Sequence, residues 1–190
     1  MYNNLLTHIQ NSYPDYTEDH YNTLIKLIKI KEVAKKEIIL KQGGICSYAA
    51  YVFKGCFMYT KNNADGEEYV SQFAMDEYWV GDISSLMHQI PAKFSIEALE
   101  DSTLMTIERK DFEDLLTTCP GFANFTRIKR EKAYDSALER SVDLNESADI
   151  RYKKLLKRYP KISQHVPLYH MASYLGITPE SLSRIRKNLY

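Results

Sequence analysis

The chain has 190 residues, of which 44% are hydrophobic and 26% charged, a composition typical of a globular protein that can bury a substantial core. Its 25 basic and 25 acidic residues cancel, so net charge alone indicates no class of partner. No apolar run approaches the length of a membrane span, and the first residues lack a signal-peptide pattern; we therefore expect a cytoplasmic protein without a membrane partner.

The first predicted element is a helix that begins after Thr17. Glu18 and Asp19 stand in its first turn, where acidic side chains favour the helix dipole. Apolar residues then recur at helical spacing: Tyr21, Leu24, Ile25 and Ile28.

From residue 37 the pattern changes to short aromatic or β-branched runs, which are 38–40, 48–53, 56–60, 69–73 and 104–107. Turn signals separate them: Gly43-Gly44, Gly55, the stretch 62–66 and Gly81. Closely spaced strands of this kind predict a β-sandwich or a rolled sheet. Asp65-Gly66 favours a hairpin, whereas Gly43-Gly44 indicates a turn, because no Gly-Lys-Ser/Thr follows it.

The chain becomes helical again after Asp111, and Pro120-Gly121 interrupts it. A long helix is predicted from Phe122 to about Asp143, with two apolar stripes offset around it: Phe122, Phe125 and Ile128, then Tyr134, Leu138 and Val142. Lys129 and Lys132 break the heptad, so periodicity alone does not establish a coiled coil.

A shorter amphipathic helix follows, with Ala148, Tyr152, Leu155 and Tyr159 on one face. Pro160 ends it. The opposite face is basic and carries Lys153, Lys154 and Lys157.

The most informative stretch is 166–190, which predicts a helix, a tight turn and a second helix. Ala172 is small enough to let the two helices cross closely, and Gly176 can take the positive φ of a helix end. Thr178 stands at an N-cap position, with Pro179 as the first helical residue. This layout favours a helix-turn-helix, whose second helix enters the DNA major groove, over an ordinary αα-hairpin.

The second helix carries polar groups suited to DNA. Arg184 can bond guanine bidentately and Glu180 can accept from the amino group of cytosine, so we expect these two residues to read bases. Ser181 and Ser183 suit phosphates or bases, and Arg186 and Lys187 suit phosphates. The predicted DNA-binding residues are therefore Thr178, Glu180, Ser181, Ser183, Arg184, Arg186 and Lys187.

Charge is distributed unevenly along the chain. Residues 151–190 hold nine Lys and Arg and a single acidic residue, hence a net charge of +8. Residues 1–150 hold 16 basic and 24 acidic residues, a net charge of −8. Such asymmetry indicates a segment that faces nucleic acid, attached to another unit.

Nothing in the sequence indicates catalysis or a metal. Cys46, Cys56 and Cys119 are too few and too widely spaced for a zinc or iron–sulfur site, and buried free thiols are expected instead. The five histidines lack HExxH spacing, and neither a GxSxG motif nor a P-loop is present. We therefore expect no enzyme, no metal and no cofactor.

The order of these parts, with the strings 172–184, 51–55 and 97–102, resembles the CRP/FNR family of bacterial transcription regulators over nearly the whole chain. The resemblance implies an α+β fold: an N-terminal helix with an antiparallel β-roll of the cyclic-nucleotide-binding jelly-roll type, a long dimerisation helix and a C-terminal helix-turn-helix. The implied domains are a sensor at 1–115, the long helix at 116–145 and a DNA-binding domain at 146–190. In this family the glutamate and the arginine that correspond to Glu180 and Arg184 read bases.

The phosphate-binding cassette departs from the family pattern of Gly-Glu followed by Pro-Arg and small residues. Asp82 replaces the glutamate that holds the ribose, Ala92 stands where an arginine pairs with the cyclic phosphate, and Phe94 takes the place of a small residue. Lys93 is a point charge and no substitute for a bidentate fork. We expect that cyclic AMP is not bound in the usual way. The ligand pocket, if kept, is predicted at Gly81, Asp82, Ser84, Ser85, Lys93 and Ser95.

A second departure is that no β-hairpin wing follows the predicted recognition helix, so further phosphate contacts are expected from Lys153, Lys154, Lys157 or Lys161. The resulting hypothesis is a homodimeric, sequence-specific DNA-binding regulator. Its expected partners are double-stranded DNA and a second copy of the chain, with RNA polymerase and an unknown small-molecule effector as further candidates. The alternative is a ligand-binding or protein-interaction module of the same fold without specific DNA binding.

Overall fold

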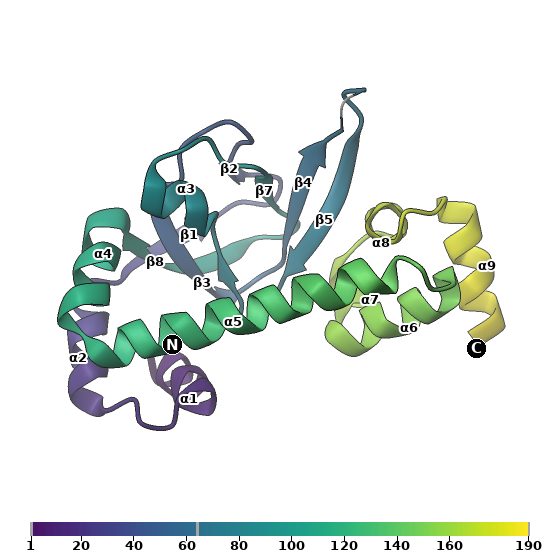
Figure 1. Ribbon diagram of the computed structural model, residues 1–190. Coiled ribbons are helices and arrows are strands. Elements are labelled where there is room, and N and C mark those ends of the chain that lie inside the picture. The colour runs from purple at the N-terminus through teal and green to yellow at the C-terminus, as the bar shows by residue number, and fades with distance from the viewer. Residues whose placement is uncertain (1, 64, 190) are drawn as a thin grey trace.

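The computed structural model describes residues 2–63 and 65–189; Met1 and Tyr190, at the outer bounds of the predicted domains, and Ala64, in the predicted turn, lie outside the described residues. The helices are α1 (Tyr2–Ser12), α2 (Glu18–Ile25), α3 (Ile83–His88), α4 (Arg109–Thr118), α5 (Pro120–Asp143), α6 (Ala148–Arg158), α7 (Ile162–His165), α8 (Leu168–Leu175) and α9 (Pro179–Leu189). The strands are β1 (Lys29–Val33), β2 (Ile38–Leu40), β3 (Tyr48–Lys54), β4 (Phe57–Asn62), β5 (Glu68–Ala74), β6 (Trp79–Val80), β7 (Ser95–Ala98) and β8 (Ser102–Glu108). Together they form the predicted α+β arrangement (Figure 1).

The strands form a roll of two four-stranded antiparallel sheets, ordered β1-β8-β3-β6 and β2-β7-β4-β5. The β4–β5 hairpin contains the predicted turn, where Gly66 has a φ of 82°. The Asn63 side-chain oxygen accepts hydrogen bonds from the backbone N–H groups of Asp65 and Glu67, which stabilises this turn. All five predicted strands are confirmed, whereas β1, β6 and β7 were not predicted.

Helices α1, α2 and α4 gather around the first half of α5 at one end of the roll (Figure 1). Thr17 caps α2 by accepting from the N–H of His20, as the sequence predicted, although α2 ends before Ile28. The start of α5 approaches α2 closely, because a Cβ on Gly121 would lie only 2.3 Å from a ring nitrogen of His20. A glycine is therefore required where the two helices meet.

The main core lies between the sheets and these helices. Its fully buried residues include Leu5 and Ile9 of α1, Tyr51 of β3, and Phe122 and Phe125 of α5. Cys46, Cys56 and Cys119 are all buried free thiols, as expected from the sequence. None of the described helices is both long and apolar enough to cross a membrane.

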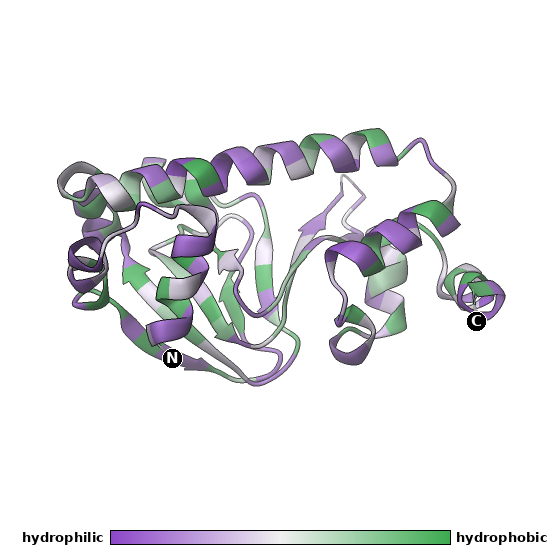
Figure 2. Ribbon diagram, turned by 90° about the horizontal axis from the view of Figure 1, so that it is seen from below, coloured by the Kyte–Doolittle hydropathy of each residue, from purple (hydrophilic) through white to green (hydrophobic). Residues whose placement is uncertain are grey.

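Helix α5 extends well beyond the roll. Its 24 residues make it about 36 Å long, and residues 131–139 are all exposed. Three large apolar side chains in its second half project into solvent four residues apart, namely Tyr134, Leu138 and Val142 (65, 50 and 68% exposed). We call these three residues the α5 stripe. Figure 2 shows α5 running along one side of the molecule, with hydrophobic turns persisting to its C-terminal end.

The C-terminal helices pack against the second sheet and share a core with it. This second core combines Met58, Val70 and Phe73 of the sheet with Tyr152, Leu155, Tyr159 and Met171 of the helices. Polar side chains reinforce the contact: the Tyr159 hydroxyl donates to the Phe73 carbonyl (3.0 Å), the Ser173 hydroxyl accepts from the Val70 N–H (3.0 Å), and Arg140 donates to the Ser71 carbonyl (2.6 Å). The C-terminal helices are thus fixed against β5.

Candidate functional site

The α8–α9 hairpin has the close crossing that the sequence predicted. Gly176 ends α8 with a φ of 65°, and the N–H of Ile177 bonds back to the Ala172 carbonyl (3.1 Å). Ala172 and Leu182 are fully buried where the two helices meet. The hairpin therefore holds α9 in a fixed orientation on α8.

The first turn of α9 is ordered by its own side chains. The Thr178 hydroxyl accepts from the N–H of Ser181 (3.2 Å), which is the predicted N-cap contact. Hydrogen bonds from the backbone N–H of Glu180 and from the Thr178 hydroxyl hold the pKa of the Glu180 carboxyl below its usual value. Glu180 is thus an exposed carboxylate at the start of α9.

One face of α9 presents three charged groups to solvent. Glu180, Arg184 and Lys187 are exposed and lie within about 60° of one another, given about 100° per residue. Arg184 donates to the Ser181 hydroxyl (3.4 Å). Half-buried Ser183 lies beside this face, whereas half-buried Arg186 lies on the flank. Neither Arg184, Arg186 nor Lys187 forms an ion pair with a residue that the structure describes. We call Glu180, Ser183, Arg184 and Lys187 the α9 face.

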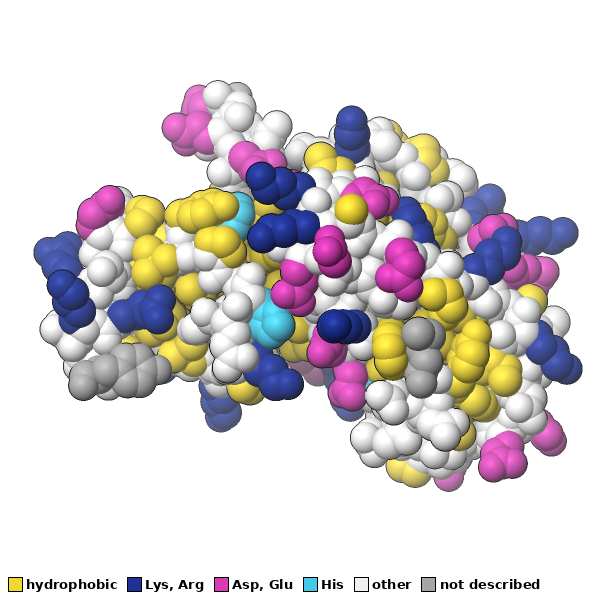
Figure 3. Space-filling model, turned by 180° about the vertical axis from the view of Figure 1, so that it is seen from behind, with side chains coloured by type: hydrophobic (Ala, Val, Ile, Leu, Met, Phe, Trp, Pro, Cys, Tyr) yellow, Lys and Arg dark blue, Asp and Glu magenta, His cyan; other side chains and the backbone are white. Residues whose placement is uncertain are grey.

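Some basic residues of the C-terminal segment are neutralised internally. Lys154 pairs with Asp143 (2.6 Å) and Glu146 (2.8 Å). Arg158 pairs with Glu139 of α5 (3.6 Å). The ammonium groups of Lys153, Lys157 and Lys161 are exposed and form no such pair among the described residues. In Figure 3 the charged side chains at the end of the molecule that carries the C-terminus are mainly basic, whereas acidic ones are more frequent towards the roll.

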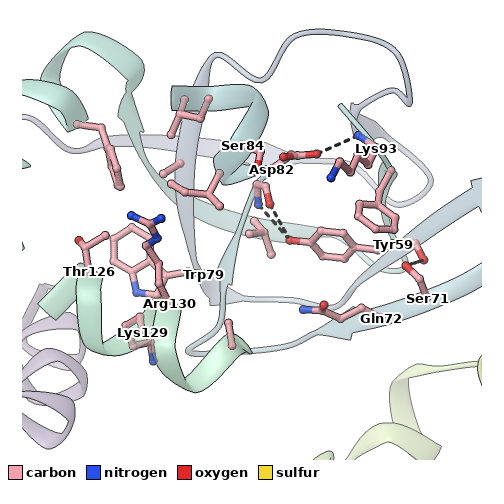
Figure 4. Close-up of a pocket in the computed structure, with 18 of the residues that line it drawn as sticks. Tyr59, Ser71, Gln72, Trp79, Asp82, Ser84, Lys93, Thr126, Lys129 and Arg130 are labelled. Atoms are coloured by element: carbon pink, nitrogen blue, oxygen red, sulfur yellow. Dashed lines mark hydrogen bonds between the residues drawn. The ribbon is translucent and has the colours of Figure 1, made fainter. Parts of the chain in front are cut away.

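A cavity of about 460 Å³ lies between the β-roll and α5 (Figure 4). Four of the predicted pocket residues line it: Gly81, Asp82, Ser84 and Lys93. Ser85 and Ser95 lie elsewhere, because their hydroxyls accept from the backbone N–H groups of Cys46 and Gln42 (2.9 Å each). Phe94 lines the cavity and packs edge-on against Tyr59.

Backbone groups already occupy the carboxylate of Asp82. One oxygen caps α3 by accepting from the Ser85 N–H (3.0 Å), and the other accepts from the Lys93 N–H (2.9 Å). Asp82 therefore ties the two ends of the cassette together. Ala92 is buried, and its backbone pairs with that of Gly43 and Gly44 (2.8 and 2.7 Å).

Tyr59 of β4 also lines the cavity, next to the cassette. Its hydroxyl accepts from the N–H of Gly81 (3.1 Å), and burial raises its pKa well above the usual value. It is therefore a neutral, fixed part of the cavity wall.

The α5 side of the cavity was not predicted from the sequence. It is formed by side chains at helical spacing: Phe122, Phe125, Thr126, Lys129, Arg130, Ala133 and Arg140. Trp79 of β6, the only tryptophan in the chain, also lines the cavity. The signal available in the sequence was the i, i+3, i+4, i+7 spacing of Phe122, Phe125, Thr126 and Lys129, of which we used only the two phenylalanines, as part of an apolar stripe.

Lys129 lines the cavity, and its ammonium lies 3.0 Å from Nε2 of His8 on α1. Burial and the positive charges of Lys129 and Lys132 lower the pKa of His8 to about 4. His8 is therefore neutral at pH 7, and its Nε2 can accept a hydrogen bond from the Lys129 ammonium. Within the described residues, no group of three or more His, Cys, Asp or Glu side chains is arranged to hold a metal ion.

Comparison with known proteins identifies similar domains and chains. Residues 30–119 match the cyclic nucleotide-binding domain family. A cAMP-dependent protein kinase regulatory subunit from Blastocladiella emersonii is 26% identical over 100 residues, which are 52% of this chain and 24% of that protein, so the chain spans about a quarter of the length of this curated relative.

Three solved structures show the same fold over most of the chain. FixK2 from Bradyrhizobium japonicum is 17% identical and has a TM-score of 0.71, covering 85% of this chain and 84% of its own. The c-di-GMP-responsive global regulator CLP from Xanthomonas campestris is 14% identical with a TM-score of 0.71 and 91% of both chains covered. A protein from Eubacterium rectale assigned to the CRP/FNR family is 19% identical with a TM-score of 0.71, covering 94% of this chain and 87% of its own.

Proposed function

We propose, from the premise that residues 30–119 form a cyclic nucleotide-binding domain within a fold of the CRP/FNR type, that the protein is a homodimeric, sequence-specific DNA-binding transcription regulator. The observation that carries the proposal is the α9 face. Its carboxylate and its two cations are exposed on one side of a helix whose other side is fixed to α8. A helix held in this way can insert into the major groove.

The side chains of the α9 face and its neighbours have separate roles in this proposal. Arg184 bonds the O6 and N7 atoms of a guanine, and Glu180 accepts from the amino group of a cytosine. Thr178, Ser181, Ser183, Arg186 and Lys187 contact phosphates near the entry and the flanks of the helix, and so fix its register. Lys153, Lys157 and Lys161 add phosphate contacts from outside the hairpin.

The α5 stripe provides the dimer contact. Large apolar side chains four residues apart on an otherwise exposed helix bury their surface when the same helix of a second copy packs against them. A two-fold axis along this contact relates the two α9 helices. The proposed operator is therefore a near-palindrome with half-sites about 34–36 Å apart.

The cassette does not fit cyclic AMP in the manner of the family. Both oxygens of Asp82 bond backbone N–H groups, so holding a ribose hydroxyl would compete with the contacts that close the cassette. At the position of the phosphate-binding arginine, Ala92 is buried and offers no cation. In this proposal the effector domain responds to a different molecule, or to none.

The test is a selection from random duplex DNA at moderate salt, with wild-type protein beside Arg184→Ala. We expect the wild type to enrich an inverted repeat and Arg184→Ala to retain binding without that preference. Arg127→Ala on α5, which removes an exposed arginine paired with Glu131, is the matched control and is expected to select the wild-type site.

The same selection addresses the alternative. Enrichment of no sequence by any of the proteins would favour a ligand-binding or protein-interaction module. The salt dependence of binding gives an independent measure, because each phosphate contact makes affinity fall more steeply as salt rises.

A further inference from the structure

The cavity between the roll and α5 combines apolar walls with an excess of positive charge. Its aromatic and aliphatic lining includes Trp79, Val80, Leu86, Phe94, Phe122 and Phe125. A volume of about 460 Å³ falls within the range of small-molecule sites. The walls therefore suit a molecule with a hydrocarbon or aromatic body.

Four cationic side chains line the cavity, against the single carboxylate of Asp82. They are Lys93, Lys129, Arg130 and Arg140. None of the four forms an ion pair with a residue in 2–63 or 65–189. Four cations and one carboxylate give the lining a formal net charge of +3, although residues 1–150, to which the lining belongs, have a net charge of −8.

The partners of two of these cations are neutral and leave the positive charge in place. Arg140 donates to the Ser71 carbonyl, and the Lys129 ammonium lies 3.0 Å from the neutral ring of His8. Burial and the charge of Lys132 lower the pKa of the Lys129 ammonium, because no anion stabilises its charged form there. A bound anion would supply the missing negative charge.

The other two cations, Lys93 and Arg130, belong to opposite walls of the cavity. Lys93 lies in the cassette, in the segment between α3 and β7, and Arg130 lies on α5. Both side chains are exposed and are therefore accessible to a solute that enters the cavity. Figure 4 shows Lys93 on the side of Tyr59 and Arg130 on the side of Trp79.

From this arrangement we infer that the cavity binds a dicarboxylic acid with an apolar body, one carboxylate at Lys93 of the cassette and the other at Arg130 of α5. Charge-assisted hydrogen bonds hold the two ends, and the aromatic walls take the body between them. Cations on two walls match two separate carboxylates better than a single phosphate, whose charge lies at one point. The inference rests on the proposed function in treating this cavity as the effector site.

A cyclic nucleotide matches the same cavity less well. It carries one negative charge, against the formal +3 of the lining. It would also bring ribose hydroxyls to Asp82, whose two oxygens already accept from backbone N–H groups. The charge of the cavity therefore favours a dianion.

The position of Arg130 gives such a ligand a route to the dimer contact. Arg130 lies one helical turn before Tyr134, the first residue of the α5 stripe. A diacid that bonds both Lys93 and Arg130 joins the cassette to α5 next to the stripe. Ligand binding thereby holds the stripe in one position relative to the roll.

The experiment is isothermal titration of the full chain without DNA. The probes are the diacids adipate, suberate and terephthalate, each beside its matched monoacid (hexanoate, octanoate and benzoate), with phenyl phosphate and cyclic AMP. We expect at least one diacid to bind at least about 10-fold more tightly than its monoacid, which corresponds to one further charge-assisted interaction.

Substitutions at the two walls test whether both ends are held. Lys93→Met and Arg130→Met are each expected to remove the preference for the diacid, while the affinity for the monoacid stays within about 3-fold of the wild-type value, because one cation remains for it. Lys26→Met, on an exposed residue at the end of α2, and Arg127→Met, on α5, are the controls outside the cavity and should bind like the wild type.

Several results would overturn the inference. They are equal affinity for every diacid and its monoacid, a preference for the diacid that survives either substitution, tighter binding of phenyl phosphate or cyclic AMP than of every diacid, or no binding of any diacid up to about 1 mM. Both substitutions replace exposed side chains, so the variants should fold like the wild type. The titration contains no DNA, so absence of diacid binding beside an intact operator preference would refute this inference and leave the proposed function standing.

Discussion

Replacing Leu138 by alanine tests the dimer contact directly. Leu138 is the middle residue of the α5 stripe and is 50% exposed in a single chain. Its removal takes little from the fold of one chain, because the surrounding residues of α5 are exposed as well. The substitution should therefore act almost entirely on association.

The magnitude follows from the exposed half of the side chain. Full burial of a leucine stabilises by about 1.5–3 kcal/mol, so covering the remaining half contributes about 1 kcal/mol per copy. A two-fold contact contains two copies of Leu138, which gives about 2 kcal/mol per dimer. The dimer dissociation constant should then rise about 30-fold in Leu138→Ala.

Sedimentation equilibrium over a range of protein concentrations measures this constant. Ile38→Ala is the matched control, because Ile38 is an equally apolar, 43% exposed residue on β2, away from α5. We expect Ile38→Ala to associate like the wild type. A dissociation constant for Leu138→Ala within about 3-fold of the wild-type value would refute the reasoning, and so would equal effects of the two substitutions.

Three further predictions concern pH, the C-terminal contact and cyclic AMP. The pKa of His8 is about 4 in the folded chain against 6.5 unfolded, so unfolded chains bind more protons than folded ones between these pH values. The contribution of His8 to the unfolding free energy should be fully present above pH 6.5, and the unfolding free energy should fall by about 2–3 kcal/mol towards pH 4. His8→Asn should flatten this pH dependence when it is measured by urea denaturation. Tyr159→Phe leaves the Phe73 carbonyl without its buried partner and should lower the unfolding free energy by about 1–2 kcal/mol, whereas Tyr169→Phe, on an exposed residue, should have no effect. Cyclic AMP should not raise the melting temperature, although a ligand at 100 times its dissociation constant would add about 2.7 kcal/mol; a clear rise would contradict our interpretation of Asp82 and Ala92.

The sequence predicted those parts of the fold whose residues carry a local signal. Aromatic and β-branched runs marked β3, β4, β5 and β8, and the Gly176 turn marked the end of α8. β1 was missed because Lys29, Lys31 and Glu32 read as a charged segment; its pairing with β8, far along the chain, makes it a strand. Helix α1 was missed for a similar reason, since its apolar residues Leu5 and Ile9 are few and gain their burial from α5.

The two candidate sites also differ in how much of each could be predicted from local sequence. The residues of the α9 face are neighbours on one helix, so spacing alone gave their arrangement. The cavity is formed by residues from β6, the cassette and α5, and only the cassette carried a recognisable pattern. Arg130 and Trp79 are about 50 positions apart and line the same cavity because the roll packs on α5, which no local pattern encodes.

The three polar contacts between β5 and the helices also bear on how the roll behaves alone. β5 is an edge strand, and its outward backbone groups would be free to pair with a strand of another molecule. Side chains from α5, α8 and the end of α6 occupy three of these groups instead, at Val70, Ser71 and Phe73. The C-terminal helices thus act as a cover that prevents strand addition, and any movement that lifts them exposes a surface prone to self-association.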